Sequence, residues 1–246
     1  MKISIITAVF NNRDTVAAAL DSVFSQSHVD SELVVIDGGS SDGTLETLSR
    51  YVDRLAVFVS EPDSGIYDAL NKGIGKATGD VVGFLHSDDL MADELALKRV
   101  AEAFADPGVD AVYGDLVYVS RNDPSNVVRR WNAGPFNVNQ LRWGWMPPHP
   151  TFYVRRELYE RLGRFDISYR IAADYDCMLR FLMSGIRVTY IPELLVKMRV
   201  GGASNRSLSS LITKSREDYA VISRHGMWPL GALLAKNIRK LPQFLG

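Results

Sequence analysis

Hydrophobic runs alternate with amphipathic stretches along the first half of the chain. The apolar runs have the length and composition of β-strands and lie at Ile3–Val9, Leu33–Ile36, Ala56–Val59, Val81–Leu85 and Ala111–Tyr118. The stretches between them repeat apolar residues with helical spacing, at Asp14–Ser25, Thr44–Tyr51, Ile66–Lys76 and Asp93–Ala105. Alternating strands and helices predict βαβ units, and strands that are apolar along their length predict burial on both faces. The pattern therefore predicts an α/β fold with a mainly parallel sheet flanked by helices.

The second half of the chain is less regular. Residues 121–150 are rich in Asn, Pro, Gly and Trp, which favours an irregular insert. Beyond it, the periodicity predicts helices at Arg156–Leu162, Ala173–Ser184 and Ser207–His225, and strands at Val188–Ile191 and Leu195–Val200. Gly201 and Gly202 predict a loop before the last of these helices.

The C-terminal stretch predicts a short basic amphipathic helix. Its apolar positions share one stripe, opposite Lys236 and Arg239, and are Leu230, Leu233, Leu234, Ile238 and Leu241. From Gly201 onward the chain contains seven Lys and Arg residues and two acidic residues, a net charge of +5. Because the whole chain has a net charge of −1, the preceding part carries −6. An acidic body with a basic tail favours a tail that meets an anionic surface.

Composition places the chain among globular proteins of a reducing compartment. Hydrophobic residues make up 46% and charged residues 23%, which suits a large buried core. The single cysteine, Cys177, excludes internal disulfides, and we expect it to be buried. No uncharged run approaches the roughly 18 residues of a membrane-spanning helix, and the N-terminus has no signal-peptide pattern. We expect a cytoplasmic protein without a nucleic-acid partner.

Polar and mostly acidic residues follow four successive predicted strands. The residues that follow them include Asn11 and Asn12, Asp37 and Asp42, the segment "SEPDSGIYDALNKG", and Asp88 with Asp89. Because ligands bind at the carboxyl ends of strands in open α/β sheets, we expect these groups to share one site. The segment "GGSSDGT" lacks the lysine of a P-loop and does not fit G-x-G-x-x-G.

The adjacent carboxylates of Asp88 and Asp89 require an explanation, because like charges repel. One interpretation is the solvated start of the following helix. The other is a divalent cation, Mg²⁺ or Mn²⁺, which binds carboxylate oxygens and keeps positions open for a diphosphate. The other acidic strand ends favour the cation.

Taken in order, these motifs resemble the family 2 glycosyltransferases, in particular small bacterial enzymes of exopolysaccharide, capsule or lipopolysaccharide assembly. The matching segments are "SIITAVFNN", "ELVVIDGGSSDGT", "SEPDSGIYDALNKGIGKATGD", "GFLHSDD", "PHPTFYVRRELYERLGRFD" and "AADYDCMLR". The resemblance covers about residues 1–205. It implies a GT-A fold with a Rossmann-like sheet, divided into a nucleotide half, about residues 1–118, and an acceptor half, about 119–205, before a helical basic tail at 206–246.

The resemblance also implies an activity. It implies metal-dependent transfer, with inversion, from a nucleotide-diphosphate sugar, with UDP favoured, to a hydroxyl of a glycan or lipid-linked acceptor. By position, Asp174 would be the general base and Asp89 the principal ligand of Mn²⁺ or Mg²⁺. The remaining positions implied to bind the donor are Asp37, Asp42, Asp68, Lys72 and Asp88. Ala173 stands where the family often has Glu, and Ser87 where a D-x-D motif has its first Asp.

Other residues are candidates or have competing interpretations. We expect His149 to approach the metal or the acceptor, and Arg199 to reach the diphosphate as the loop beside it closes. Alternatives are Asx turns for Asp37 and Asp42, an N-cap for Asp174 and a solvated charge for Lys72. Asp176 is expected at the surface. Sugar stacking or burial remain open for Trp131, Trp143 and Trp145.

Two other functions compete with glycosyl transfer. A sugar nucleotidyltransferase would need a basic, glycine-rich loop after the first strand, where this chain has "FNNRD". A non-catalytic nucleotide-binding protein would not need both Asp89 and Asp174. "QLRW", Gln140 to Trp143, precedes Asp174 and lacks flanking membrane helices, so it does not indicate a processive synthase. The basic tail predicts attachment to the inner face of the membrane, with packing on its own domain or on a second subunit as the alternative.

Overall fold

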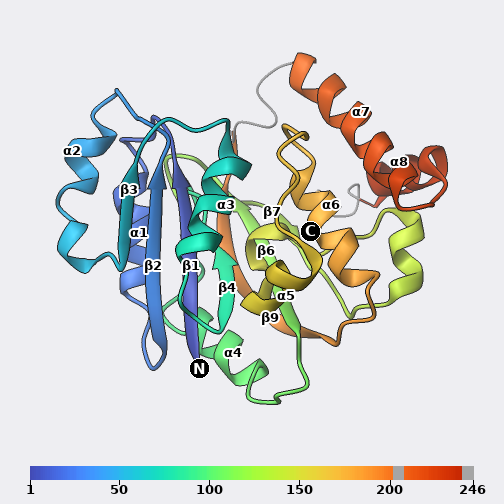
Figure 1. Ribbon diagram of the computed structural model, residues 1–246, viewed down its shortest axis with the longest axis horizontal. Helices are drawn as coiled ribbons and strands as arrows, with labels where there is room; N and C mark the ends of the chain where they lie inside the picture. The colour runs from blue at the N-terminus through green and yellow to red at the C-terminus, as the bar shows by residue number, and fades with distance from the viewer. Residues whose placement is uncertain (202–207, 240–246) are drawn as a thin grey trace.

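The computed structural model describes residues 1–201 and 208–239 (Figure 1). Its strands are β1 (Lys2–Val9), β2 (Asp30–Asp37), β3 (Val57–Ser60), β4 (Val81–Phe84), β5 (Leu90–Met91), β6 (Ala111–Val119), β7 (Val127–Trp131), β8 (Tyr153–Arg155) and β9 (Val188–Arg199). Its α-helices are α1 (Val16–Phe24), α2 (Thr44–Leu48), α3 (Ile66–Lys76), α4 (Ala96–Ala103), α5 (Arg156–Leu162), α6 (Ala173–Leu182), α7 (Leu208–Arg224) and α8 (Pro229–Ile238). Short 3₁₀ helices are η1 (Val52–Arg54), η2 (Val138–Trp143) and η3 (His149–Thr151).

The described strands form one mixed sheet in the order β3-β2-β1-β4-β8-β6-β9-β5, with β7 beside β6. The first four strands in that order are parallel, as are β6 and β9. The predicted α/β fold and mainly parallel sheet are therefore confirmed. In the register, Val9 pairs with Asp37 and Asp37 with Ser60, which brings the carboxyl ends of β1, β2 and β3 to one edge.

Helices cover both faces of the sheet because successive strand residues point to opposite sides. On one face, Ile6 of β1 packs in a cluster with Leu70 of α3 and Leu179 of α6. On the other face, Ile5 of β1 packs in a cluster with Leu20 of α1 and Leu97 of α4. These side chains are all buried, and each contributes about 1.5–3 kcal/mol to folding.

The second half of the sheet departs from the predicted pattern. The two strands predicted at residues 188–191 and 195–200 are one strand, β9, and the insert contains β7. The short strands β5 and β8 were not predicted either. β8 lies between β4 and β6 and is antiparallel to both. A strand of three residues has no detectable period, so its place depends on partners distant in sequence.

The two C-terminal helices lie at the opposite end of the molecule from α2 (Figure 1). α8 packs on its own domain: Gly231 and Ala232 are buried, and the backbone of Gly144, after η2, approaches Ala232 so closely that a Cβ at Gly144 would lie 2.5 Å from its carbonyl oxygen. Lys236, which was predicted opposite the apolar stripe, points inward, 2.9 Å from Asp218 and over the ring of Tyr175. The reason is the buried Asp218 carboxylate, which requires a cationic partner.

Some predicted features lie outside the described residues. They are the loop at 202–207, with Arg206, and the end of the tail at 240–246, with Lys240 and Leu241. Within the described ranges, none of the helices combines the length and hydrophobicity needed to cross a membrane.

Candidate active site

Hydrogen bonds between loops join the carboxyl ends of β1, β2 and β4. The amide of Asn11 donates to Ser40 Oγ at 2.8 Å, and the amide of Asn12 donates to Thr44 Oγ1 at 2.9 Å. The side chain of Asn12 donates to Ser87 Oγ at 2.8 Å. The expectation that these strand ends share one region is confirmed.

Asp37 and Asp42 both shape the loop that follows β2. Asp37 is fully buried and accepts hydrogen bonds from the amides of Gly39 and Ser40 and from the hydroxyls of Ser40 and Ser60. Asp42 accepts from the hydroxyl and amide of Thr44 and from the amide of Arg13, and these bonds lower its pKa. Both acids thus form the turns that were the alternative interpretation, and a role at the nucleotide stays a prediction for each.

The segment after β3 packs against this loop. The carboxylate of Asp63 lies so close to Gly38 that a Cβ there would displace it. Asp68 accepts from the amide of Ser64 at 3.1 Å and lies 3.6 Å from the ammonium of Lys72. Lys72 also lies 2.9 Å from Glu61, whose hydrogen bond raises the lysine pKa. Lys72 is therefore held in an ion-pair network and is not a freely solvated charge.

Asp89 is a buried carboxylate without enough partners. It is 1% exposed, and its Oδ1 accepts from the amide of Arg199 at 3.0 Å. Its Oδ2 is buried and has no hydrogen-bond partner among the described residues. Burial, reinforced by the neighbouring charge of Asp88, raises the pKa of Asp89 well above its usual value. The alternative of a helix N-cap is wrong, because α4 begins seven residues later, after Leu95.

Arg199 lies behind this pair of acids. It is 6% exposed, and its guanidinium donates to the carbonyl oxygens of Asp88 at 2.7 Å and Arg121 at 3.2 Å. Together with the hydrogen bond from the Arg199 amide to Asp89, these bonds connect the end of β9 to the segment after β4 and hold that segment in place. Contact with a diphosphate stays a prediction, since part of the adjacent loop lies at residues 202–207, outside the described chain.

Asp174 lies in the first turn of α6 with part of its carboxylate exposed. Its Oδ1 accepts from the hydroxyl of Tyr67 at 3.1 Å and from the amide of Tyr175 at 2.8 Å. The hydroxyl of Tyr67 also donates to the carbonyl of Ile171 at 2.6 Å. The N-cap interpretation is wrong, because Ala172 is the N-cap residue and has no side-chain bond. Tyr67 was not singled out from the sequence.

Two histidines, His86 and His149, lie near the candidate acids Asp88 and Asp174. His149 is buried, with Nδ1 4.0 Å from Asp174 Oδ2, and its ring centroid is 6.0 Å from that of His86. Burial lowers the pKa of His149 to about 4, and its Nε2 has no hydrogen-bond partner among the described residues. Burial also lowers the pKa of His86, although the charges of both Asp88 and Asp174 oppose this. His86 thus lies within electrostatic reach of both acids.

The side chains expected to bind a metal ion suit a hard cation only in part. In residues 1–201 and 208–239, no three His, Cys, Asp or Glu side chains gather closely enough to hold a metal ion. The expected set of Asp88, Asp89 and His149 is therefore not a preformed three-ligand site, because His149 packs beside Phe84 and Asp174 instead. The orphaned Oδ2 of Asp89 does suit Mg²⁺ or Mn²⁺, whose other positions a diphosphate and water would fill.

α7 holds the segment that leads into α6. Glu217 accepts hydrogen bonds from three successive amides, those of Arg170, Ile171 and Ala172, at 2.8–2.9 Å. This contact spans 45 to 47 residues, and no local pattern of the sequence indicated it. Because the bonded amides immediately precede α6, Glu217 fixes the position from which Asp174 extends.

Asp176 was expected at the surface and is instead buried. Its Oδ1 lies 3.0 Å from His225 Nε2 and its Oδ2 lies 3.4 Å from Arg180. Burial opposes its ionisation, but the bond with His225 and the arginine charges outweigh this and lower its pKa. The error arose because α6 is enclosed by α7, which the periodicity of α6 alone does not reveal.

Comparison with known proteins decides the family. The family model described as "Glycosyl transferase family 2" matches residues 4–163, more than half of the chain. This chain belongs to glycosyl transferase family 2. The PGL/p-HBAD biosynthesis glycosyltransferase of Mycobacterium bovis is 33% identical over 208 residues, 82% of this chain and 78% of that relative. An uncharacterized glycosyltransferase of Mycobacterium tuberculosis is 33% identical over 236 residues, 93% of this chain and 86% of that relative.

Solved structures show that this glycosyltransferase has the GT-A fold. S. aureus TarS 1-349 in complex with UDP-GlcNAc has a TM-score of 0.69 at 18% identity, covering 90% of this chain and 64% of that chain. The mannosyltransferase PcManGT of Pyrobaculum calidifontis, in complex with GDP-Man and Mn²⁺, has a TM-score of 0.68 at 22% identity, covering 97% of this chain and 70% of that chain. The chain spans 43% of the longer S. aureus TarS chain.

The sequence indicated candidate acids of this glycosyltransferase but not the contacts that hold them. Asp89 and Asp174 became candidates because each stands in a recognisable motif. Tyr67 also stands in such a motif, in "GIYDALNKG", and an aromatic hydroxyl there was the available signal. For Glu217 the sequence offered no such signal.

Proposed function

We propose that this glycosyltransferase moves a sugar from a nucleoside-diphosphate sugar to a hydroxyl of a glycan or lipid-linked acceptor during cell-surface polysaccharide biosynthesis. The reaction is a single displacement with inversion at the anomeric carbon, and Asp174 is its general base. The observation that carries the proposal is the joint placement of the acids. The ring of His86, two residues before Asp88, lies 6.0 Å from the ring of His149, and Nδ1 of His149 lies 4.0 Å from Asp174 Oδ2. This chain of contacts supports one site that contains both acidic groups.

The base must take a proton from a hydroxyl whose own pKa is far above neutral. Asp174 suits this because its Oδ1 is held by Tyr67 and by the amide of Tyr175, while its Oδ2 takes part in neither bond and would accept the proton. As the acceptor oxygen bonds to the anomeric carbon, its proton moves to Asp174 and the bond to the diphosphate oxygen breaks. The electron pair of that bond leaves with the diphosphate. A positioned base of this kind is typically worth about 10²–10⁴-fold in rate.

His149 assists on the acceptor side of the site. Its low pKa keeps the imidazole neutral at pH 7, and its unpartnered Nε2 is available to hydrogen-bond an acceptor hydroxyl. Its Nδ1 faces Asp174, so the ring also restricts the orientation of the base.

Asp88 and Asp89 would hold a divalent cation beside the donor. When bound, Mn²⁺ or Mg²⁺ supplies positive charge where the leaving diphosphate becomes negative. Asp89 offers the unpartnered Oδ2, and Arg199 braces the segment from behind. Asp37, Asp42, Asp68 and Lys72 keep the proposed donor-binding role through the loops that they shape, and UDP is the favoured nucleotide. The neighbours with UDP-GlcNAc and with GDP-Man and Mn²⁺ support this class of donor.

Product analysis tests the proposal. The protein is incubated with UDP-, GDP- and dTDP-sugars, an acceptor glycan and Mn²⁺, and released nucleotide is identified by chromatography. We expect a nucleoside diphosphate as the product, and we expect Asp174→Asn to lower its rate at least about 100-fold. A sugar nucleotidyltransferase would instead form a nucleotide sugar from a nucleoside triphosphate and a sugar phosphate. Turnover by Asp174→Asn at the parent rate would contradict the base assignment.

A lipid-linked acceptor places the reaction at a membrane surface. We propose that the protein works at the inner face of the cell membrane as a peripheral enzyme, since none of its described helices can span it.

A further inference from the structure

Large apolar side chains gather on the outer side of η2, α7 and α8, which we call the outer face. The most exposed are Trp143 at 54%, Ile212 at 62%, Trp228 at 68%, Leu230 at 64%, Leu234 at 65% and Ile238 at 54%. Val138, Leu211 and Tyr219 are also exposed. Scattered exposed apolar residues are ordinary, but their concentration on elements that contact one another, η2 with α8 and α8 with α7, is a feature of interaction sites.

The outer face is not used for packing within the chain. α8 turns Gly231, Ala232 and Lys236 inward, and Leu233 packs against the core. Leu230, Leu234 and Ile238 follow one another at successive helical turns on the other side. The predicted apolar stripe is therefore split, with Leu233 facing the domain and its neighbours facing outward.

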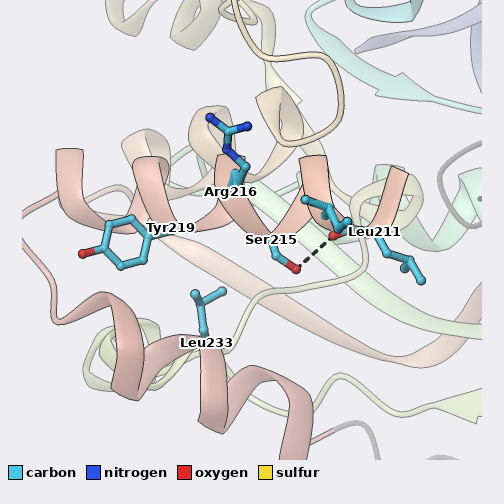
Figure 2. A pocket seen from close by; sticks show the side chains of 6 residues that line it. Leu211, Ser215, Arg216, Tyr219 and Leu233 are labelled. Atoms are coloured by element: carbon cyan, nitrogen blue, oxygen red, sulfur yellow. Dashed lines mark hydrogen bonds between the residues drawn. The ribbon is translucent and has the colours of Figure 1, made fainter. Parts of the chain in front are cut away.

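An open groove of about 650 Å³ runs between α7 and α8. Figure 2 shows Leu211, Ser215 and Tyr219 along α7, with Leu233 of α8 opposite them. Arg216 points away from α8 in the same view. The groove is lined mainly by apolar side chains, so it extends the outer face between the two helices.

The charges of this region are strongly asymmetric. In the described parts of η2, α7 and α8 there are two acids, and neither is directed outward as a free charge. Asp218 is buried against Lys214 and Lys236, and Glu217 accepts the three amides before α6. The exposed charged residues there are Arg142, Arg216 and Arg239, together with Arg224, which is paired with Asp166 at 2.8 Å. The outer face is thus apolar and basic.

We propose that the outer face binds an anionic lipid bilayer. Apolar side chains with tryptophan enter the boundary between headgroups and acyl chains, while arginines at the edge attract anionic headgroups. A second copy of the chain fits less well, because a two-fold interface would place the arginines of one copy near those of the other. α7 contacts both lipid and the segment before Asp174, so a lipid-linked acceptor would arrive beside the base. That last step rests on the proposed function, whereas lipid binding does not.

Vesicle co-sedimentation of the full chain tests the proposal without any turnover. The vesicles are phosphatidylcholine alone, or phosphatidylcholine with phosphatidylglycerol, at low and high salt. We expect binding to the anionic vesicles that weakens with salt. Leu230→Gln with Leu234→Gln should weaken that binding at least about tenfold, since both lose apolar contact with the bilayer. Arg142→Gln with Arg239→Gln should weaken it on anionic vesicles and change nothing on neutral ones.

Matched controls separate this face from the rest of the surface. Val52→Gln with Val128→Gln removes two exposed apolar residues from η1 and β7, and Arg50→Gln with Arg161→Gln removes two exposed arginines elsewhere. Both control variants should bind as the parent does. Thermal unfolding of each variant checks that the fold is intact.

Three results would overturn the proposal. They are no sedimentation with anionic vesicles at low salt, equal loss of binding in the controls, and a dimer in light scattering that Leu230→Gln with Leu234→Gln dissociates. Because glycosyl transfer is assayed separately with a soluble acceptor, loss of the lipid proposal removes the membrane location but leaves the proposed transfer reaction standing, and loss of the transfer reaction leaves lipid binding standing.

Discussion

The loop after β2 and the segment after β4 both follow parallel strands and both carry two acids, yet they differ in how those acids are bonded. In the loop after β2, Asp37 accepts four hydrogen bonds from its own surroundings. In the segment after β4, Asp89 is equally buried and keeps Oδ2 without a partner. A fully bonded acid holds a loop in shape, whereas a buried acid with an unused oxygen costs stability until a ligand arrives. Motif and burial alone do not distinguish the two.

The largest expected effect contrasts two acids of α6 that are two residues apart. Asp174→Asn should lower kcat about 10²–10⁴-fold with little change in Tm, because it removes the base from a partly exposed site. Asp176→Asn should leave kcat per folded molecule close to the parent value and cost about 2–4 kcal/mol of stability, because it breaks a buried pairing with His225 and Arg180. Steady-state kinetics and denaturant unfolding measure both. The contrast fails if the two variants lose activity equally.

The second effect concerns the contact that positions the base. Glu217→Ala removes three hydrogen bonds from the segment before α6, and displacement of Asp174 should lower kcat about 10–100-fold. Donor affinity should stay unchanged, because the loops after β1, β2 and β4 do not touch Glu217. Glu217→Gln, which keeps one acceptor oxygen, should recover part of kcat. Ser215→Ala on the same helix serves as control, and an equal loss of donor affinity would contradict a positioning role.

The third effect compares the two loops directly by their stability. Asp37→Asn replaces one of the two acceptor oxygens with an NH2 group, which then faces at least one hydrogen-bond donor, and should cost about 1–3 kcal/mol. Asp89→Asn should keep or raise Tm at pH 7, because it removes a buried charge whose ionisation is disfavoured. Thermal unfolding without ligands measures both variants. A larger destabilisation by Asp89→Asn than by Asp37→Asn would refute the distinction between the two acids.

The smallest effect lies at the other end of β2 and should leave the chemistry untouched. Burial of Glu32 favours its neutral form, but hydrogen bonds from Lys2, Ser4 and Thr78 outweigh this and lower its pKa to about 2. Since the folded-state pKa lies below the unfolded value, its stabilisation is present above about pH 4.5 and is lost as pH falls toward 2.

Glu32→Gln makes that acid dependence measurable. Between pH 5 and pH 3 the parent should lose about 1–2 kcal/mol more stability than the variant, because only the parent must protonate this carboxyl. Urea unfolding at the two pH values gives the comparison. Parallel losses in both proteins would show that Glu32 does not titrate in this range.

The elements of the first 118 residues were largely predictable because most of them are long enough to show a clear period. α3 was predicted with its observed bounds, and the strands β1, β2 and β4 were predicted within three residues of theirs. After residue 118, the three-residue strand β8 pairs with β4 across about 70 residues, and Glu217 bonds to residues about 45 positions earlier. Periodicity carries no information about such pairings.

The residues of the candidate site also differ in how far the sequence could predict them. Asp89 and Asp174 were predictable because each stands in a motif, but the burial of Asp176, the inward turn of Lys236 and the bracing by Arg199 depend on which helix covers which face. These features arise because each of the three buried charges has a partner in the folded protein. Asp176 pairs with His225, Lys236 pairs with Asp218, and Arg199 donates to backbone carbonyl oxygens. The amino-acid sequence alone does not show which charged residues lie close together in the folded protein.

Calorimetric titration of UDP, GDP and dTDP, each with and without Mn²⁺, tests the central claim most directly. The claim is that Asp89 holds a cation that binds the diphosphate of the donor. For the preferred nucleotide, we predict that Mn²⁺ tightens binding at least about tenfold in the parent and not at all in Asp89→Asn, since a direct metal contact is worth several kcal/mol. Binding that is equally tight with and without Mn²⁺, or an equal gain from Mn²⁺ in Asp89→Asn, would contradict it.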